Sequence, residues 1–347
     1  MNTKKLFAML LAIVMTAGLL AGCGSAPSSK EDASSGNSGS NTNAPADTDA
    51  SGGGDGEEKV LIGFSLKTVN NPFVVSVKNG AAKAAEDYGA ELIITDAQLD
   101  SQKQMADLES FMQQKVDVIL IDALDSSAII PTITDAYDAG FKIMTEDVRL
   151  NDAGDMITTH VGIDNKASGE IIAQYLVDKL KAEGKKNVVI FEGLPGAEAT
   201  LSRAEGFHAV LDNDPDINIL YNKNVGDQRT QGLTEMDDVL QQFDHIDAVI
   251  CCNDELALGA ISSIEGAGRE GIYVTGFDGN SDAQQAVKDG RMLATIDHAP
   301  YSMGYLAIEA AVKIARGESV EKMTTMSVEL VDSSNIDEIM AKHADEA

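Results

Sequence analysis

The sequence predicts an α/β fold with two doubly wound parallel-sheet lobes that follow one another along the chain. From Lys59 onward, short segments rich in Val and Ile alternate with longer amphipathic segments, as strands and helices do in parallel sheets. Segment 118–121 is apolar throughout, which is typical of a strand covered by helices on both faces. About five such segments fall in each half of this region, so we expect two sheets rather than one large sheet.

Strand candidates and helix ends can be placed along this region. The strand candidates are 60–66, 91–95, 116–121, 142–145, 158–162, 187–191, 217–220, 248–252, 273–277, 293–296 and, as a late addition, 325–331. The first helix has a recognisable start, because Asn71 is a good N-cap and Pro72 suits the first helical position. Four glycines mark helix ends where a positive φ is needed: Gly89, Gly140, Gly184 and Gly290. Segment 337–347 is expected to be a frayed helix.

The composition limits the classes of function. The chain has 56 acidic and 26 basic residues and a formal charge of −30, and such a surface repels the phosphate backbone of nucleic acids. Its three cysteines are too few for the disulfide framework of small secreted domains. We interpret Cys251 and Cys252, which stand in an apolar strand, as small buried hydrophobic residues. We therefore expect no nucleic-acid partner and a core that is stabilised by packing.

The first residues have the parts of an export signal. Two lysines precede a short apolar run, and small residues follow before Cys23, which predicts a signal peptide at 1–22. Its end, Leu20-Ala21-Gly22-Cys23, resembles the lipobox of bacterial lipoproteins. This resemblance implies that Cys23 is lipidated and anchors the protein to the extracytoplasmic face of the cell membrane. The alternative is an uncleaved helix with a chance cysteine beyond it.

The next segment, 23–58, is predicted to be a disordered tether. Between residues 24 and 58 there is no aromatic residue and no aliphatic side chain larger than Ala, apart from proline. Such a segment cannot bury enough apolar surface to fold. As a flexible coil it would span roughly 33 Å.

Polar side chains stand directly after the predicted strands. They are Asp96, Asp122, Glu146, Asp147, Glu192, Asn253, Asp278, Asp297 and His298. Ligands of open parallel sheets bind beyond the carboxyl ends of the strands, so we expect two such rims to close on one small polar ligand. Carboxylates accept paired hydrogen bonds from neighbouring hydroxyl groups, and a Phe ring covers the apolar face of a sugar. This mixture favours a polyhydroxylated ligand; the alternative is that these residues cap helices or form Asx turns.

Three motifs resemble those of a known family. They are Asn70-Asn71-Pro72-Phe73, Asn253-Asp254-Glu255 and Gly276-Phe277-Asp278-Gly279. With their order and spacing over about 59–331, the chain resembles the ribose/galactose-type (type I) periplasmic substrate-binding proteins of bacterial ABC sugar importers. The resemblance implies two α/β lobes, joined by a three-crossover hinge, that close around a sugar and are then recognised by a membrane permease.

The resemblance also implies where each lobe begins and ends. The N-terminal lobe is expected at 59–162 and 299–324, the C-terminal lobe at 163–298 and 325–335, and a tail at 336–347. The hinge crossings are then expected near 162–164, 296–298 and 324–325.

The resemblance implies a set of ligand-contacting residues from both lobes. They are Asn71, Phe73, Asp122, Asp147, Asn253, Phe277, Asp278 and His298. Asp147 and Asp278 correspond to the strand-end carboxylates that grip sugar hydroxyl groups, and Phe73 to a ring that stacks on the ligand. Each also has a structural interpretation, for example Asn71 and Asn253 as helix caps and Phe73 as a core side chain.

The chain departs from ribose binders at several positions. Val148 and Leu201 stand where two sugar-contacting arginines are usual, Asp122 stands in place of an Asn, and Asp227 in place of an aromatic residue. His298 takes the position of a hinge Gln, where it either contacts the ligand or packs in the hinge. Two nearby arginines either replace the missing ones or have structural roles, the latter slightly favoured for the second: Arg149 and Arg203. The identity of the sugar or polyol stays open.

Other motifs lack the context that their chemistry needs. The run Gly266-Ala267-Gly268-Arg269-Glu270-Gly271 matches G-x-G-x-x-G, but it ends a helix and precedes a strand, so we interpret it as a helix-terminating turn. The acidic run at 212–216 lacks the Gly and the bidentate Glu of a calcium loop. The histidines have no metal-ligand spacing, and no nucleophile elbow or P-loop is present. We expect no metal, no cofactor and no enzymatic activity.

These observations favour an extracytoplasmic solute-binding lipoprotein that captures a sugar or related polyhydroxylated molecule and delivers it to the permease subunits of an ABC transporter. We expect it to be a monomer. The alternative is a receptor for signalling or chemotaxis, a sensor of an autoinducer or a sugar, built on the same fold. A transcriptional repressor needs a basic helix-turn-helix segment before the first lobe, where this chain has an export signal and an acidic tether.

Overall fold

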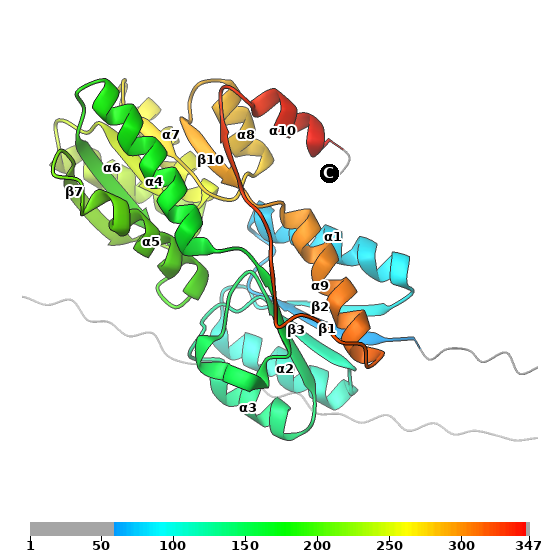
Figure 1. Ribbon diagram of the computed structural model, residues 1–347. Helices are drawn as coiled ribbons and strands as arrows, with labels where there is room; N and C mark the ends of the chain where they lie inside the picture. Colours follow the sequence, from blue (N-terminus) through cyan, green and yellow to red (C-terminus); the bar gives the residue numbers. More distant parts are fainter. Residues whose placement is uncertain (1–58, 345–347) are drawn as a thin grey trace, which may run out of the picture. The chain divides into compact units, whose positions relative to one another are not determined.

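The computed structural model describes residues 59–344, which form two six-stranded sheets with helices on both faces (Figure 1). The predicted signal peptide, Cys23 and the predicted tether lie outside these residues. The predicted class of two doubly wound α/β lobes is confirmed, because helices connect strands that run parallel in both sheets except for one antiparallel pair. Each sheet with its helices is called a lobe below.

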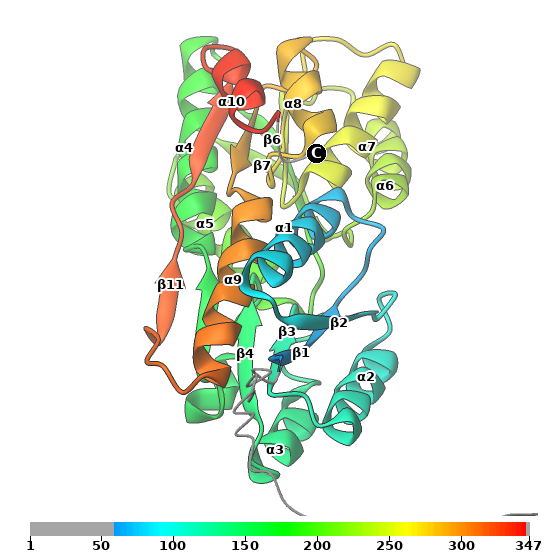
Figure 2. The ribbon, with the colours of Figure 1, turned by 90° about the vertical axis from the view of Figure 1, so that its right-hand side faces the viewer.

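The first sheet has the strand order β11-β5-β4-β3-β1-β2, and all its pairs are parallel. Its strands are β1 (Leu61–Leu66), β2 (Glu91–Asp96), β3 (Val118–Ile121), β4 (Lys142–Glu146), β5 (Thr159–Gly162) and β11 (Met323–Thr325). Its helices are α1 (Pro72–Tyr88), α2 (Ser101–Gln114), α3 (Ile130–Asp138), the 3₁₀ segment η1 (Asn151–Met156) and α9 (Pro300–Ala315). Helices α1 and α9 lie side by side on one face (Figure 2), and α2 and α3 cover the other.

The second sheet has the order β12-β10-β9-β8-β6-β7, in which β10 and β12 are antiparallel. Its strands are β6 (Asn187–Glu192), β7 (Asn218–Asn224), β8 (Ala248–Cys251), β9 (Tyr273–Thr275), β10 (Ala294–Asp297) and β12 (Glu329–Asp332). Its helices are α4 (Asn165–Ala182), α5 (Glu198–Leu211), α6 (Arg229–Gln242), α7 (Asp254–Gly266), α8 (Ser281–Lys288) and α10 (Ile336–Lys342). Helices α4 and α5 pack on one face of the sheet and α6 and α7 on the other.

Within the described residues the chain passes between the two sheets three times: after β5, after β10 and between β11 and β12. The prediction of one late strand at 325–331 is wrong, because this segment contains the end of β11 and the start of β12, which belong to different sheets. The crossing therefore runs through 326–328, beyond the expected 324–325. Met326 and Val328 pack against the core on the way across, so the apolar alternation continues through the crossing and hides the break.

The predicted helix ends are confirmed. The side chain of Asn71 accepts a hydrogen bond of 2.9 Å from the backbone N of Phe73 at the start of α1, and the four predicted glycines have positive φ. Helix α7 ends at Gly266, and Gly268 and Gly271 have positive φ before β9. The glycine run is therefore a helix-terminating turn, as predicted.

Two expectations concerned the core and the C-terminal segment. Cys251 and Cys252 are buried and unpaired, as predicted for small hydrophobic residues. The C-terminal segment does form helix α10, but its described part is packed rather than frayed, because Ile336 and Ile339 are buried in the core of the second lobe.

Helices α1 and α9 approach each other closely at two glycines. A Cβ atom at Gly304 would lie 1.9 Å from the carbonyl oxygen of Val77, and one at Gly80 would lie 1.9 Å from that of Tyr301. No side chain larger than hydrogen fits at either place. The contact fixes the N-terminal halves of the two helices, which begin next to the carboxyl ends of the strands, against each other.

Candidate ligand-binding site

Side chains that follow strands of both sheets meet at one cavity of about 20 Å³. We call four of the lining residues from the first lobe the first wall: Lys67, Asn71, Phe73 and Asp147. We call four of those from the second lobe the second wall: Arg203, Asp227, Asn253 and Asp278. All of them are at least nine-tenths buried. A cavity of this size has room for one or two water molecules.

The first wall is organised around Lys67, which directly follows β1. Its Nζ atom lies 2.8 Å from Oδ2 of Asp147 and 3.1 Å from Oδ1 of Asp122. Burial by itself lowers the pKa of Lys67, but the two carboxylates raise this pKa well above its ordinary value, so the ammonium group stays charged. Sequence reasoning missed Lys67, although a lysine directly after a buried apolar strand was an available signal.

Asp147 and Asp278 stand on opposite walls in unusual backbone conformations. Their φ angles are 52° and 129°, a region that residues with side chains seldom adopt and that is often found at functional sites. Arg203 lies between them, with Nη1 3.2 Å from Oδ1 of Asp278 and Nη2 3.6 Å from Oδ1 of Asp147. Burial raises the pKa of Asp147, but Lys67 and Arg203 lower it below the ordinary value. The Asp147 carboxylate is therefore ionised.

Arg203 lines the cavity and also makes structural contacts. These contacts are consistent with the structural role that the sequence slightly favours for this residue. Its Nε donates to Oδ1 of Asn165 at 2.8 Å, and Nη1 donates to the carbonyl oxygen of Cys252 at 3.1 Å. Its guanidinium carbon lies 4.0 Å from the centroid of the Phe277 ring. These contacts hold the guanidinium group in place at the cavity.

Three rings stand next to one another beside the cavity. Phe73 and His298 are stacked, with centroids 4.6 Å apart and planes at 8°, and Phe277 meets His298 edge-on at 5.5 Å. His298 is fully buried, and its Nε2 lies 3.4 Å from Oδ1 of Asp278. Phe73 lines the cavity, whereas His298 and Phe277 lie behind the lining residues. In this structure the two therefore support cavity-lining groups instead of lining the cavity themselves.

The two predicted amide side chains line the cavity and also cap helices. Asn71 caps α1 as described above. Asn253 accepts a hydrogen bond of 2.8 Å from the backbone N of Leu256, and its Nδ2 donates to the carbonyl oxygen of Asp227 at 3.2 Å. Capping and a position at the cavity are therefore compatible for both residues.

Four buried carboxyl groups at or near the cavity have oxygens with no hydrogen-bond partner among the described residues. They are Asp122, Glu146, Asp147 (through Oδ1) and Asp227. Asp122 lies behind the first wall and is held by its ion pair with Lys67. Burial raises the pKa of Asp122 to about 7 and the pKa of Glu146 well above its ordinary value, and it also raises the pKa of Asp227. Such groups can bond to a ligand, as acceptors when they are ionised and also as donors when they are protonated.

Of the two residues that stand where ribose binders have arginines, only one lines the candidate site. Val148 is fully buried and lines the cavity. Leu201 is 40% exposed and lines a separate cavity of about 570 Å³. Arg149 does not line the candidate site, because its Nη2 donates to the carbonyl oxygen of Ile163 at the first crossing, at 3.0 Å.

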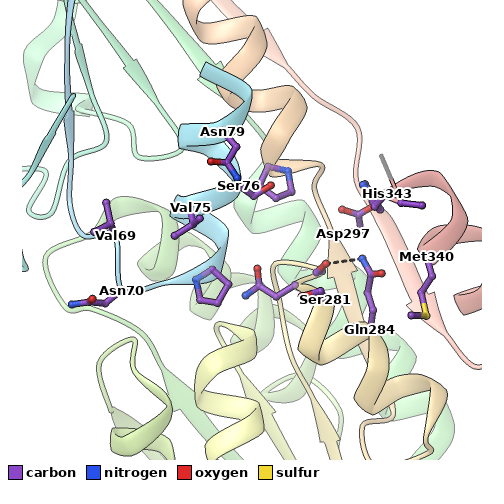
Figure 3. A pocket seen from close by; sticks show the side chains of 15 residues that line it. Val69, Asn70, Val75, Ser76, Asn79, Ser281, Gln284, Asp297, Met340 and His343 are labelled. Carbon is purple, nitrogen blue, oxygen red and sulfur yellow. Dashed lines mark hydrogen bonds and ion pairs between the residues drawn. The ribbon is translucent and has the colours of Figure 1, made fainter. Parts of the chain in front are cut away.

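A larger cavity of about 580 Å³ lies between the start of α1 and helices α8 and α10 (Figure 3). Amide, hydroxyl and apolar side chains dominate its lining, for example Asn79, Ser76 and Met340. The carboxylate among its lining residues, Asp297, lies 2.7 Å from Nε2 of His343. The carboxylates predicted to contact a ligand all lie outside this cavity, and the smaller cavity is therefore the candidate site.

Residues 59–344 contain no group of three or more His, Cys, Asp or Glu side chains arranged to hold a metal ion. None of the helices in this part of the chain combines the length and the apolar character needed to cross a bilayer.

Comparisons with known proteins agree with this geometry. Residues 62–319 match the model of the periplasmic binding protein domain. The ribose import binding protein RbsB of Bacillus subtilis (strain 168) is 41% identical over 274 residues, which cover 79% of this chain and 88% of that protein.

Two solved structures are similar over most of the chain. An ABC transporter solute-binding protein from Bacillus halodurans C-125, with bound myo-inositol, is 30% identical with a TM-score of 0.77, covering 83% of this chain and 99% of that one. A periplasmic solute-binding protein from Actinobacillus succinogenes 130z, with bound D-allose, is 30% identical with a TM-score of 0.75, covering 81% of this chain and 100% of that one. The chain therefore belongs to the type I periplasmic binding proteins of ABC sugar importers.

Proposed function

We propose that this protein captures a sugar or a related polyhydroxylated molecule between its two lobes and delivers it to an ABC transporter permease. The observation that carries this proposal is the convergence of Asp147 and Asp278 from opposite lobes on one cavity, beside the ring of Phe73. The names of the similar proteins support it, since they are binding proteins for ribose or structures with bound myo-inositol or D-allose. We propose that capture is non-covalent, without a catalytic step, and that the protein acts as a monomer.

The two walls supply the contacts that a hydroxyl-rich ligand needs. Asp147 and Asp278 each offer carboxylate oxygens to neighbouring hydroxyl groups, and the Phe73 ring packs on the apolar face of a sugar ring. A charge-assisted hydrogen bond contributes about 1.5–3 kcal/mol, and a Kd of 1 μM corresponds to about −8 kcal/mol. Two bidentate carboxylates are therefore sufficient for micromolar binding.

Entry of a monosaccharide requires the two walls to separate, because the cavity of about 20 Å³ has room only for water. We propose that the lobes move about the hinge crossings. The ion pair between Arg203 and Asp147 joins one lobe to the other. A ligand that bonds to both Asp147 and Asp278 strengthens this connection and favours the closed arrangement, which is the form that we propose the permease recognises.

We propose that the protein works outside the cytoplasmic membrane, anchored by a lipid on Cys23. Support comes from the export signal and its lipobox-like end, which precede the described residues. Two or more acyl chains hold a protein at a membrane, whereas a single chain binds reversibly. Mass spectrometry of the mature N-terminus is expected to find an acylated Cys23, and an unmodified cysteine contradicts the anchor.

Thermal-shift screening against pentoses, hexoses and inositols, followed by titration calorimetry of the best hit, tests the binding site. We expect Asp147→Ala and Asp278→Ala each to weaken binding at least 100-fold, because each removes two charge-assisted hydrogen bonds. Asp138→Ala is the control, since Asp138 is an exposed carboxylate at the end of α3. Unchanged affinity in both cavity variants contradicts the site.

A further inference from the structure

The walls of the cavity contain more acidic than basic side chains. The acidic lining residues are Asp147, Asp227 and Asp278, and the basic ones are Lys67 and Arg203. Two further buried carboxyl groups, Asp122 and Glu146, do not line the cavity, and burial raises their pKa values, that of Asp122 to about 7, which reduces their negative charge. A buried charge without a counter-charge is costly, so the three lining carboxylates and two cations leave a deficit of positive charge at the site.

The two cations are already engaged. Lys67 pairs with Asp122 and Asp147, and Arg203 pairs with Asp278 and faces Asp147. Asp227 takes no part in these ion pairs, although only 4% of it is exposed. Its Oδ1 atom is buried and has no hydrogen-bond partner among the described residues. Asp227 is therefore the lining carboxylate that these two cations do not pair with.

The backbone of Asp227 is held in place, while its carboxylate is not. Its N–H donates to Oε1 of Gln231 at 3.1 Å, and its carbonyl oxygen accepts from Nδ2 of Asn253 at 3.2 Å. The nearby Arg229 does not neutralise it, because this arginine makes hydrogen bonds of 3.0 and 2.7 Å to Glu255. The carboxylate is thus presented to the cavity from a fixed position, with no ion-pair partner among residues 59–344.

Asp227 also lines a neighbouring cavity of about 250 Å³ that both lobes contribute to. Asn71 lines both cavities as well, so the two adjoin. Side chains of Thr68, Gln228 and Thr230 add hydroxyl and amide groups to the larger one. There is room beside Asp227 for a ligand group that the smaller cavity alone does not accommodate.

We propose that the ligand carries an ammonium group, as an amino sugar or an aminated polyol does, and that Asp227 receives this group. The inference rests on the proposed function and specifies the class of ligand. An ammonium group donates three hydrogen bonds and supplies the missing positive charge, whereas a hydroxyl group donates one and leaves the deficit. The hydroxyl groups of the same ligand remain available to Asp147 and Asp278.

Matched pairs of ligands test this proposal. Titration calorimetry at pH 6.5 compares D-glucose with D-glucosamine, D-galactose with D-galactosamine, and myo-inositol with its monoamino derivative. In at least one pair we expect the amine to bind at least tenfold more tightly than its hydroxyl counterpart. Asp227→Asn is expected to reduce this ratio at least tenfold. Asp138→Asn, which removes the same charge from an exposed position, leaves the ratio unchanged.

The outcomes separate this inference from the function on which it rests. If the hydroxyl compounds bind as tightly as their amines in every pair, the ammonium inference is wrong and the proposed function stands. An equal loss of both compounds in Asp227→Asn overturns it in the same way. If no compound of either kind binds to the wild-type protein but the thermal-shift screen finds another sugar or polyol without an amine, the inference fails and the proposed function stands. If that screen also finds no ligand, both fail. The wild-type comparison needs no variant, so poor folding of Asp227→Asn does not remove the test.

Discussion

The two walls of the cavity neutralise their carboxylates in different ways. In the first wall, Lys67 belongs to the same lobe as its partners Asp122 and Asp147, so this cluster of charges is complete within one lobe. In the second wall, Arg203 divides its charge between Asp278 of its own lobe and Asp147 of the other. The charges of the first wall are therefore paired within one lobe, whereas the cation of the second wall also faces a carboxylate of the other lobe.

Among the variants that test this difference between the walls, Lys67→Met is expected to have the largest effect on stability. It removes the cation from a buried cluster and leaves Asp122 and Asp147 without their partner, which is expected to lower the free energy of unfolding by about 3–5 kcal/mol. Denaturant titration at pH 7 measures the loss. Lys166→Met is the control, because Lys166 is exposed on α4, and it is expected to change stability by less than about 0.5 kcal/mol.

The pH dependence of this loss follows from the directions of the pKa shifts. The raised pKa of Lys67 and the lowered pKa of Asp147 mean that the wild-type pair contributes fully between pH 3.8 and pH 10.5, the ordinary values of the two groups. Without Lys67, the pKa values of the two carboxylates rise, so protonation relieves part of the cost at low pH. The destabilisation is therefore larger at pH 8 than at pH 5. A loss that does not change with pH contradicts a charged cluster.

The second comparison concerns the helix pairs that carry the two walls. Helices α1 and α9 meet at Gly304, and in the other lobe a Cβ at Gly206 of α5 would lie 2.3 Å from the carbonyl oxygen of Lys166 in α4. We expect Gly304→Ala and Gly206→Ala each to lower the free energy of unfolding by about 1–3 kcal/mol, because the added methyl group overpacks the contact. Thermal unfolding measures both.

Gly266→Ala is the matched control for these glycines. A Cβ at Gly266 meets no atom within 4 Å, and its φ is not positive, so this variant is expected to keep or slightly raise the stability. If Gly304→Ala is as stable as this control, the two first-lobe helices are not held by the close contact.

Sequence reasoning succeeded where the chemistry of neighbouring residues decides the structure. The Asn71 cap is local, because its side chain bonds to a backbone group two residues away. The Asp147 and Asp278 positions follow from the rule that ligands bind at the carboxyl ends of parallel strands. By contrast, the partner of Lys67 in the first wall lies 80 residues away along the chain. No local sequence pattern predicts such a pair.

The same limit applies to the predicted site residues that lie behind the cavity. Phe277, which was predicted to end a strand, and His298, which was predicted to follow one, both follow strands of the second sheet. Whether such a side chain reaches the cavity depends on what stands in front of it. Arg203 covers the Phe277 ring, and Phe73 stacks on His298. Arg203 comes from a helix, α5, rather than from a strand end, so the rule on strand ends does not include it.

The smallest expected effect is that of an arginine at Leu201 on ligand affinity, compared with an arginine at Val148. The resemblance to ribose binders places an arginine at this position and another at Val148, yet only Val148 lines the candidate site. Because Leu201 is 40% exposed and lines a separate cavity, Leu201→Arg is expected to change ligand affinity by less than threefold. Val148→Arg, in contrast, places a long charged side chain among the lining residues and is expected to change ligand affinity more than Leu201→Arg does. If titration shows that Leu201→Arg raises the affinity tenfold or more, an arginine there reaches the ligand, and the second wall extends further along α5 than its present lining residues.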